Sequence, residues 1–239
     1  MMFGPNFVYK CPKCGKFTTN RSLLSGNTTG ATLYSDGRMI APMLMEFPFI
    51  TKCERCKEFY WLVDKNLLGV YGYEYKYYSK IYTASCAVFL SLHEYIEAIN
   101  MKIYTNKDEE NYLRLRLWWA FNHRTREDEN IFISNDKTRE NKNIFIDKDD
   151  KEIYESNCIK MIETLDKNTI SGKLRSAELF RNLGDYVECN NILDLIHEEE
   201  YICIRDSLRS ECEKNNQYTI ELKNWKKYDY GHILWIKRA

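Results

Sequence analysis

The chain has little proline or glycine and no excess of charge of either sign. Its 239 residues include 4 Pro and 10 Gly, against 18 Tyr, 11 Phe and 5 Trp. This balance argues against a disordered chain and predicts a packed core. Lys and Arg together number 35, as do Asp and Glu, so no net charge attracts the whole molecule to nucleic acid or to a membrane surface.

Long hydrophobic runs and a secretory leader are also lacking. The longest apolar-leaning stretch, residues 83–92, is too short to span a bilayer. The first residues do not combine a basic segment with an apolar run, which is the pattern of a signal peptide. We therefore expect a cytoplasmic protein that does not associate with membranes.

Sequence patterns typical of catalysis are missing as well. His93-Glu94 is not followed by a second His at metalloprotease spacing, and no phosphate-binding glycine loop or nucleophile elbow occurs. His123, His197 and His232 are isolated in the sequence, which is typical of surface or structural histidines. We predict no catalytic residues and no organic cofactor site, and favour a non-enzymatic role. An active site assembled from distant residues is the alternative.

Two short segments are near copies of each other. One reads Cys11-Pro-Lys-Cys14-Gly-Lys-Phe17 and the other Cys53-Glu-Arg-Cys56-Lys-Glu-Phe59. Two cysteines separated by two residues can chelate one ion from a single tight turn, and two such turns complete a tetrahedron of thiolates. The sequence thus predicts one bound Zn²⁺, with iron as the rival. Four protein ligands leave no open position, so the metal should be structural.

The residues around these cysteines suggest how the turns, here called knuckles, are built. Gly15 permits the left-handed backbone that follows a Cys-x-x-Cys turn, whereas Lys57 takes the equivalent place in the second knuckle. Phe17 and Phe59 are expected to shield the sulfurs from water. The cations expected to offset the thiolate charge are Lys13, Lys16, Lys52, Arg55 and Lys57. The other cysteines, expected to be buried thiols, are Cys86, Cys158, Cys189, Cys203 and Cys212.

Residues 8–63, with their paired knuckles, resemble zinc ribbons. This resemblance implies a small antiparallel β domain, which we place at residues 1–66. A hairpin is predicted where strands 31–35 and 38–41 flank Asp36-Gly37, a dipeptide suited to tight turns. Two more strands are predicted at 47–51 and 59–63. Zinc ribbons bind nucleic acid, dock proteins or serve as scaffolds, so the resemblance narrows the function little.

A mostly helical part is predicted to follow a connector. Residues 67–82 alternate Tyr with other residues and form the Tyr-rich connector, and residues 217–239 form a C-terminal tail. The domain between them, 83–216, is predicted to be helical apart from an exposed loop at 130–150, in which 131–133 and 144–146 could pair as short strands. The predicted helices are 84–101, 108–126, 151–165, 171–183, 186–196 and 199–213. The fold class is therefore α+β.

Residues of about 171–197 resemble one tetratricopeptide-type helical hairpin. Small Ala177 precedes large Phe180, Gly184 separates the two helices, and Cys189 stands where Ala is typical. Lys173 departs from the pattern, which usually has a large apolar residue there. One hairpin is not an array, so plain helix-bundle packing is the preferred interpretation. Joined to the zinc ribbon, the hairpin also resembles a class of uncharacterised bacterial zinc-ribbon proteins with repeat-like helices.

Two functions follow from these patterns. The first is a non-enzymatic adaptor that binds another protein through its helical part. The alternative is nucleic-acid binding through the basic knuckles and the tail, where cations alternate with aromatic residues. The tail residues concerned are Lys223, Trp225, Lys226, Lys227, Tyr228, Lys237 and Arg238.

Overall fold

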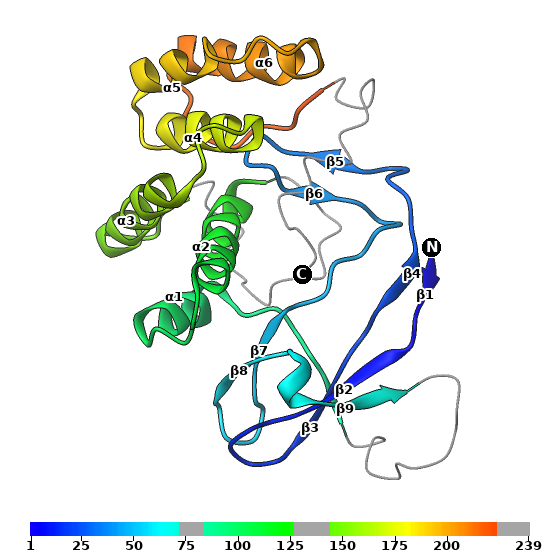
Figure 1. The fold of residues 1–239 in the computed structure, drawn as a ribbon. Helices are drawn as coiled ribbons and strands as arrows, with labels where there is room; N and C mark the ends of the chain where they lie inside the picture. The colour runs from blue at the N-terminus through cyan, green and yellow to red at the C-terminus, as the bar shows by residue number, and fades with distance from the viewer. Residues whose placement is uncertain (72–83, 127–143, 224–239) are drawn as a thin grey trace. The chain divides into compact units, whose positions relative to one another are not determined.

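The computed structural model describes residues 1–71, 84–126 and 144–223, and its fold class is α+β, as predicted (Figure 1). The chain divides into two compact units. The first combines Met1–Ala31 with Ala41–Ile103, and the second combines Thr32–Ile40 with Tyr104–Ala239. The sequence patterns predict domain borders after residues 66, 82 and 216. These borders refer to domains that fold independently, and they stay a prediction. Among the described residues, no helix is both long and apolar enough to cross a bilayer.

A four-stranded sheet with the order β10-β3-β2-β9 supports the first unit. Its strands are β2 (Asn6–Lys10), β3 (Phe17–Asn20), β9 (Leu67–Tyr71) and β10 (Ser85–Cys86). Neighbouring strands are antiparallel except β10, which runs parallel to β3. The start of the predicted connector is therefore a strand of this sheet. Tyr73, Tyr75 and Tyr77 lie outside the described residues.

Two smaller ribbons belong to the same unit. β1 (Met2–Phe3) pairs with β4 (Leu23–Ser25), and β7 (Ile50–Lys52) pairs with β8 (Phe59–Trp61), both in antiparallel fashion. The β7–β8 hairpin confirms a strand at each predicted place, but β7 covers only the end of the predicted 47–51 and continues to Lys52, and β8 covers only the start of the predicted 59–63. A 3₁₀ turn, Asp64–Asn66, connects β8 to β9.

Helix α1 (Leu92–Asn100) ends the first unit and is shorter than the predicted helix 84–101. Its beginning is set by a capping box: the Ser91 hydroxyl accepts a hydrogen bond from the Glu94 N–H, and the Glu94 carboxylate accepts one from the Ser91 N–H. The residues before Ser91 were wrongly predicted to be helical. Ser85 and Cys86 instead pair with β3, a long-range contact that helical periodicity cannot reveal.

The second unit contains the other five helices of the described chain. They are α2 (Lys107–Asn122), α3 (Lys148–Thr164), α4 (Ile170–Asn182), α5 (Tyr186–Leu193) and α6 (Ile202–Glu213), with 3₁₀ turns at His123–Thr125 and Glu199–Tyr201. All five were predicted within a few residues. Polar N-caps explain where four of them begin, because each cap side chain accepts a hydrogen bond from a backbone N–H of the first turn. These caps are Asn106, Asp147, Thr169 and Asp185.

The predicted hairpin at Asp36-Gly37 is confirmed, and it belongs to the second unit. Strands β5 (Thr32–Leu33) and β6 (Met39–Ile40) are antiparallel, and Gly37 has a φ of 75°. Near the end of the described chain, residues 220–222 pair with residues 33–35: the Leu222 N–H donates to the Leu33 carbonyl at 2.8 Å, and the Ser35 N–H donates to the Ile220 carbonyl at 2.9 Å. The tail from residue 224 onwards lies outside the described residues.

Aromatic side chains of α2 and α3 form the core of this unit. Trp118 and Phe121 on α2 are fully buried, as is Tyr154 on α3 apart from 2% of its surface. Phe145 packs edge-on against Tyr154, with the ring centroids 5.2 Å apart. The strand predicted at 144–146 is absent because this segment contributes its aromatic ring to the helical core; 131–133 lie outside the described residues.

Candidate metal centre

The four predicted ligands lie in two equivalent hairpin turns. Cys11 and Cys14 occupy the turn between β2 and β3, and Cys53 and Cys56 occupy the turn between β7 and β8. Figure 1 shows both turns at the lower end of the first unit, in dark blue and light blue. The strand pairs place the turns so that residues 39 to 45 positions apart in the chain meet at one point.

The sulfur atoms are arranged as a metal requires. The Cys11 and Cys56 sulfurs lie 3.6 Å apart, the Cys14 and Cys53 sulfurs lie 3.5 Å apart, and all four lie within 4.8 Å of one another. A tetrahedron with metal–sulfur bonds of about 2.3 Å has sulfur–sulfur edges of about 3.8 Å. Four cysteines are therefore positioned to bind one metal ion. Within the described ranges, no other group of three or more His, Cys, Asp or Glu side chains is so arranged.

Both knuckles have the same backbone hydrogen bonds. In the first, the Gly15 N–H donates to the Cys11 carbonyl and the Cys11 N–H to the Lys16 carbonyl; the Lys57 and Cys53 N–H groups repeat this pattern in the second. Gly15 has a φ of 71° and Lys57 a φ of 60°, so both adopt the left-handed backbone. Lys57, which stands where glycine would be easiest, therefore carries a conformational cost: a residue with a Cβ is disfavoured in this backbone conformation by roughly 1–2 kcal/mol.

Backbone N–H groups also act on the sulfurs. A hydrogen bond from the backbone of Lys16 is the largest cause that lowers the pKa of Cys14, to about 7. The backbone of Glu58 acts in the same direction on Cys56, but desolvation and the three neighbouring thiols outweigh it and raise the pKa of Cys56 to about 12. A metal ion bound by the four sulfurs would supply the positive charge that favours loss of the remaining thiol protons.

Two lysines of the first knuckle form ion pairs with carboxylates of the second knuckle. The Lys13 ammonium lies 2.8 Å from the Glu58 carboxylate, and the Lys16 ammonium lies 2.6 Å from that of Glu54. Each pair joins one knuckle to the other. For Lys13, the expected interaction with the sulfurs is only a weaker contribution: the Glu58 carboxylate is the main cause that raises the pKa of Lys13, and the thiols of Cys56 and Cys11 add less. Lys52 similarly contacts Glu97, at 2.7 Å.

Apolar cover comes mainly from residues that the sequence did not indicate. Tyr9, Tyr60, Leu62 and Ala87 form a buried cluster with Cys11 and Cys53. The Tyr60 hydroxyl donates to the Thr18 hydroxyl at 2.7 Å, and burial raises the pKa of Tyr60 to about 12. Of the two phenylalanines expected to shield the sulfurs, Phe59 is buried and Phe17 is half-buried. Strand alternation could have revealed Tyr9, which precedes Cys11 by two residues and so shares its face.

The remaining cysteines only partly fit the prediction of buried thiols. Cys158, Cys189 and Cys212 are buried, whereas Cys203 is partly exposed and Cys86 is exposed. His93 and His197 are exposed and His123 is partly exposed; His232 lies outside the described residues.

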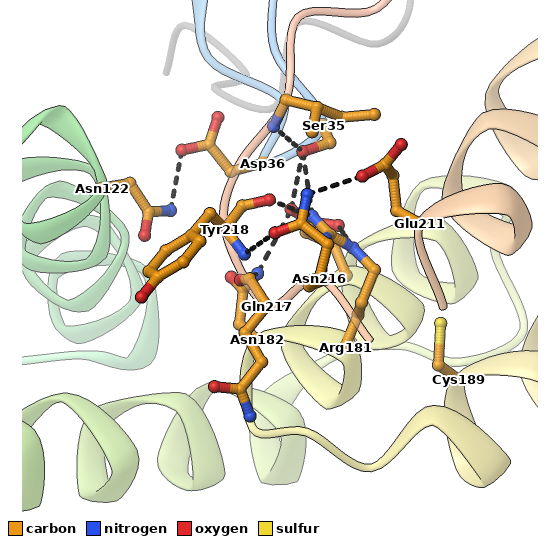
Figure 2. Close-up of polar contacts among 12 residues, drawn as sticks. Ser35, Asp36, Asn122, Arg181, Asn182, Cys189, Glu211, Asn216, Gln217 and Tyr218 are labelled. Atoms are coloured by element: carbon orange, nitrogen blue, oxygen red, sulfur yellow. Dashed lines mark hydrogen bonds and ion pairs between the residues drawn. The ribbon is translucent and has the colours of Figure 1, made fainter. Parts of the chain in front are cut away.

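A second polar cluster, within the second unit, was not predicted. Arg181 on α4 is fully buried and forms an ion pair with Glu178 at 2.7 Å, and Glu178 also accepts a hydrogen bond from the Ser35 hydroxyl at 2.7 Å. Asp36 accepts from Asn122 at 2.9 Å and forms an ion pair with Arg126. Figure 2 shows Asn122 and Asp36 facing each other, and Arg181 among the backbone groups of 216–218. The sequence signal for this cluster is the i, i+3, i+4 spacing of Glu178, Arg181 and Asn182, which places the three side chains on one face of a helix.

The partners within this cluster indicate a structural role. Arg181 donates to the carbonyls of Asn216 and Tyr218, and Asn182 donates to that of Gln217 at 2.8 Å. The carbonyls of three successive residues are thereby satisfied by two side chains of α4. The carboxylates of Glu178 and Asp36 are each paired with an arginine. The cluster therefore anchors the hairpin β5–β6 and the segment 216–218 to α4, as buried polar groups require.

Comparison of the chain with protein-family models, curated proteins and solved structures found no significant match. The similarity to zinc ribbons and tetratricopeptide hairpins therefore rests on the residues themselves, and the function is argued from their geometry.

Proposed function

We propose that this chain is a non-enzymatic cytoplasmic adaptor that binds another protein and is organised by one structural Zn²⁺ ion. The single observation that carries the proposal is the closed set of four sulfurs. When all four positions of a tetrahedral ion are taken by protein, no position is left for water or substrate. The metal then contributes folding free energy, on the order of 10 kcal/mol for such sites.

The choice of zinc over iron rests on the chemistry of the donors and on the setting. Four thiolates in tetrahedral geometry suit both ions. Zinc is proposed because the knuckles lie in a small ribbon attached to a larger helical part and because a scaffold needs no redox chemistry. Elemental analysis of purified protein tests this: one zinc per chain supports it, whereas iron, with the visible absorption of iron–thiolate bonds, contradicts it.

The α4–α5 hairpin supports binding of a protein by the helical part. Ala177 and Cys189, the small residues of the tetratricopeptide-like pattern, are both fully buried. Lys173, which departs from that pattern, donates from its ammonium to the Leu195 carbonyl at 3.0 Å and so stabilises the end of the second helix. Ordinary helix-bundle packing would bury the same residues, so the exposed side chains of the hairpin distinguish the two interpretations.

Helix α5 offers such exposed side chains. Val187, in its first turn, is 74% exposed, and Leu195, just past its end, is 57% exposed. Exposed aliphatic side chains on a docking helix are groups that a partner would cover. Affinity capture at native salt should recover a stoichiometric protein with the full chain and lose it with Val187→Glu. The matched control is Asn191→Glu, also exposed on α5. Recovery of no stoichiometric protein would count against the adaptor role.

A further inference from the structure

Two buried cysteines of the second unit face each other across a pair of helices. The Cys212 thiol, on α6, donates toward the Cys189 sulfur, on α5, with 3.2 Å between the sulfur atoms. Cys189 is fully buried and Cys212 is 4% exposed. Figure 2 shows Cys189 next to Arg181, at the margin of the polar cluster. Both cysteines are free thiols in this structure.

The helices that carry these thiols are already held together by other contacts. Arg209 on α6 forms an ion pair with Asp194, and Arg205 donates to the Ile196 carbonyl at 3.2 Å. A disulfide bond has a length of about 2.0 Å, so the two sulfurs must approach by about 1.2 Å. Side-chain rotation can supply much of that movement, because sulfur positions depend on χ1. The reduced pair is thus preorganised for bond formation.

We propose that Cys189 and Cys212 form a redox-active dithiol that a low-molecular-weight disulfide converts into an intramolecular disulfide. This site is separate from the metal centre and goes beyond the adaptor role. Its substrate class is a small disulfide, RSSR, and its reductant is a thiol of the same kind.

The reaction proceeds by two exchanges. The Cys212 thiolate, from the more exposed of the two residues, attacks one sulfur of RSSR; an S–S bond breaks, RS⁻ leaves, and a mixed disulfide remains on Cys212. The Cys189 thiolate then attacks the Cys212 sulfur and expels the second RS⁻. The two thiol protons pass to the two leaving thiolates. The cysteine sulfurs lose two electrons and RSSR gains two, giving the protein disulfide and two RSH.

Burial determines the rate of this reaction. Desolvation raises the pKa of Cys189 and of Cys212, so thiolate is scarce at neutral pH and exchange is slow. The product links α5 to α6, and α6 leads into the segment whose backbone is held by Arg181. A crosslink between residues 23 positions apart restricts the unfolded chain. The oxidised second unit should melt about 5–10 °C higher than the reduced one.

The test uses the full zinc-loaded chain incubated with oxidised glutathione. Free thiols are then alkylated, and the protein is digested with trypsin without reduction. Cleavage after arginine and lysine places Cys189 in the peptide 182–205 and Cys212 in the peptide 210–214. Mass spectrometry should find these two peptides joined, and a reducing agent should separate them.

Cys203 provides the matched control, because it lies in the same tryptic peptide as Cys189. The joined peptides should persist in Cys203→Ser and vanish in Cys189→Ala, a substitution to the residue typical of that position in tetratricopeptide helices. The wild-type readout does not depend on how either variant folds. The proposal is overturned if the peptides are not joined after prolonged incubation, or if Cys203→Ser abolishes the linkage. If the protein with the Cys189–Cys212 disulfide melts at the same temperature as the reduced protein, the disulfide does not stabilise the contact between α5 and α6, and that part of the proposal is wrong.

Discussion

Lys57 adopts in the second knuckle the same left-handed backbone that Gly15 adopts in the first, with φ values of 60° and 71°. Two turns with the same hydrogen bonds thus differ in strain, because only one of them carries a Cβ at this position. Substitutions at Lys57 and Gly15 can therefore measure the free-energy cost of backbone strain in the second knuckle.

Replacing Lys57 with Gly should therefore stabilise the first unit. Relief of roughly 1–2 kcal/mol of backbone strain is partly offset by about 0.5–1 kcal/mol for the greater freedom of glycine in the unfolded chain. We expect a net gain of about 0.5–1 kcal/mol in the free energy of unfolding of the metal-loaded protein, measured by denaturant titration. Gly15→Ala is the reciprocal control and should be destabilising. Equal stability of all three proteins would contradict the strain argument.

Loss of one metal ligand should unfold the first unit. In Cys14→Ser or Cys56→Ser, the ion keeps only three thiolates, and most of a contribution on the order of 10 kcal/mol is lost. Elemental analysis should show that bound metal falls from one ion per chain to a small fraction. Cys86→Ser is the control, since Cys86 is exposed and lies outside the cluster. A strong chelator should reproduce the effect on the wild-type protein, and unchanged thermal stability in its presence would refute the metal's structural role.

Breaking the buried ion pair of α4 should be costly. Arg181→Met leaves the Glu178 carboxylate buried without its cation and frees the carbonyls of Asn216 and Tyr218. We expect a loss of about 3–5 kcal/mol in the stability of the second unit, measured by urea unfolding. The matched control is Arg209→Met, which removes an exposed ion pair with Asp194 and should cost at most about 1 kcal/mol. Similar losses in both variants would show that the polar cluster anchors little.

Nucleic-acid binding through the knuckles and the C-terminal tail stays the alternative prediction, and a gel-shift titration tests it. Lys13 and Lys16 are paired with Glu58 and Glu54, so breaking these pairs would offset part of any gain from phosphates. We expect no salt-sensitive shift of DNA or RNA at micromolar protein. A shift that weakens steeply between two salt concentrations would instead favour the alternative. The double variant Glu54→Gln/Glu58→Gln removes the ion pairs of Lys16 and Lys13. Comparing its nucleic-acid affinity with that of the wild-type protein shows how much these ion pairs suppress binding.

The cysteine cluster and the helices could be predicted because their signals are local. Cys11 and Cys14 lie in one turn, and the doubled spacing at Cys53 and Cys56 predicts the other two cysteines of the same cluster. The helices of the second unit are marked by apolar periodicity and by caps such as Thr169 and Asp185. Asp36-Gly37 likewise specifies its own hairpin through the backbone angles that glycine allows.

Tertiary structure alone decided which distant segments pair. The strand Ser85–Cys86 gains its conformation from β3, and Glu178 and Arg181 become a buried pair only because Ser35 and the segment 216–218 pack against α4. The approach of Cys189 to Cys212 depends in the same way on two helices docking. Sequence patterns report how each residue relates to its neighbours along the chain. Contacts over long separations depend instead on how whole elements bury their surfaces, and no local pattern encodes that choice.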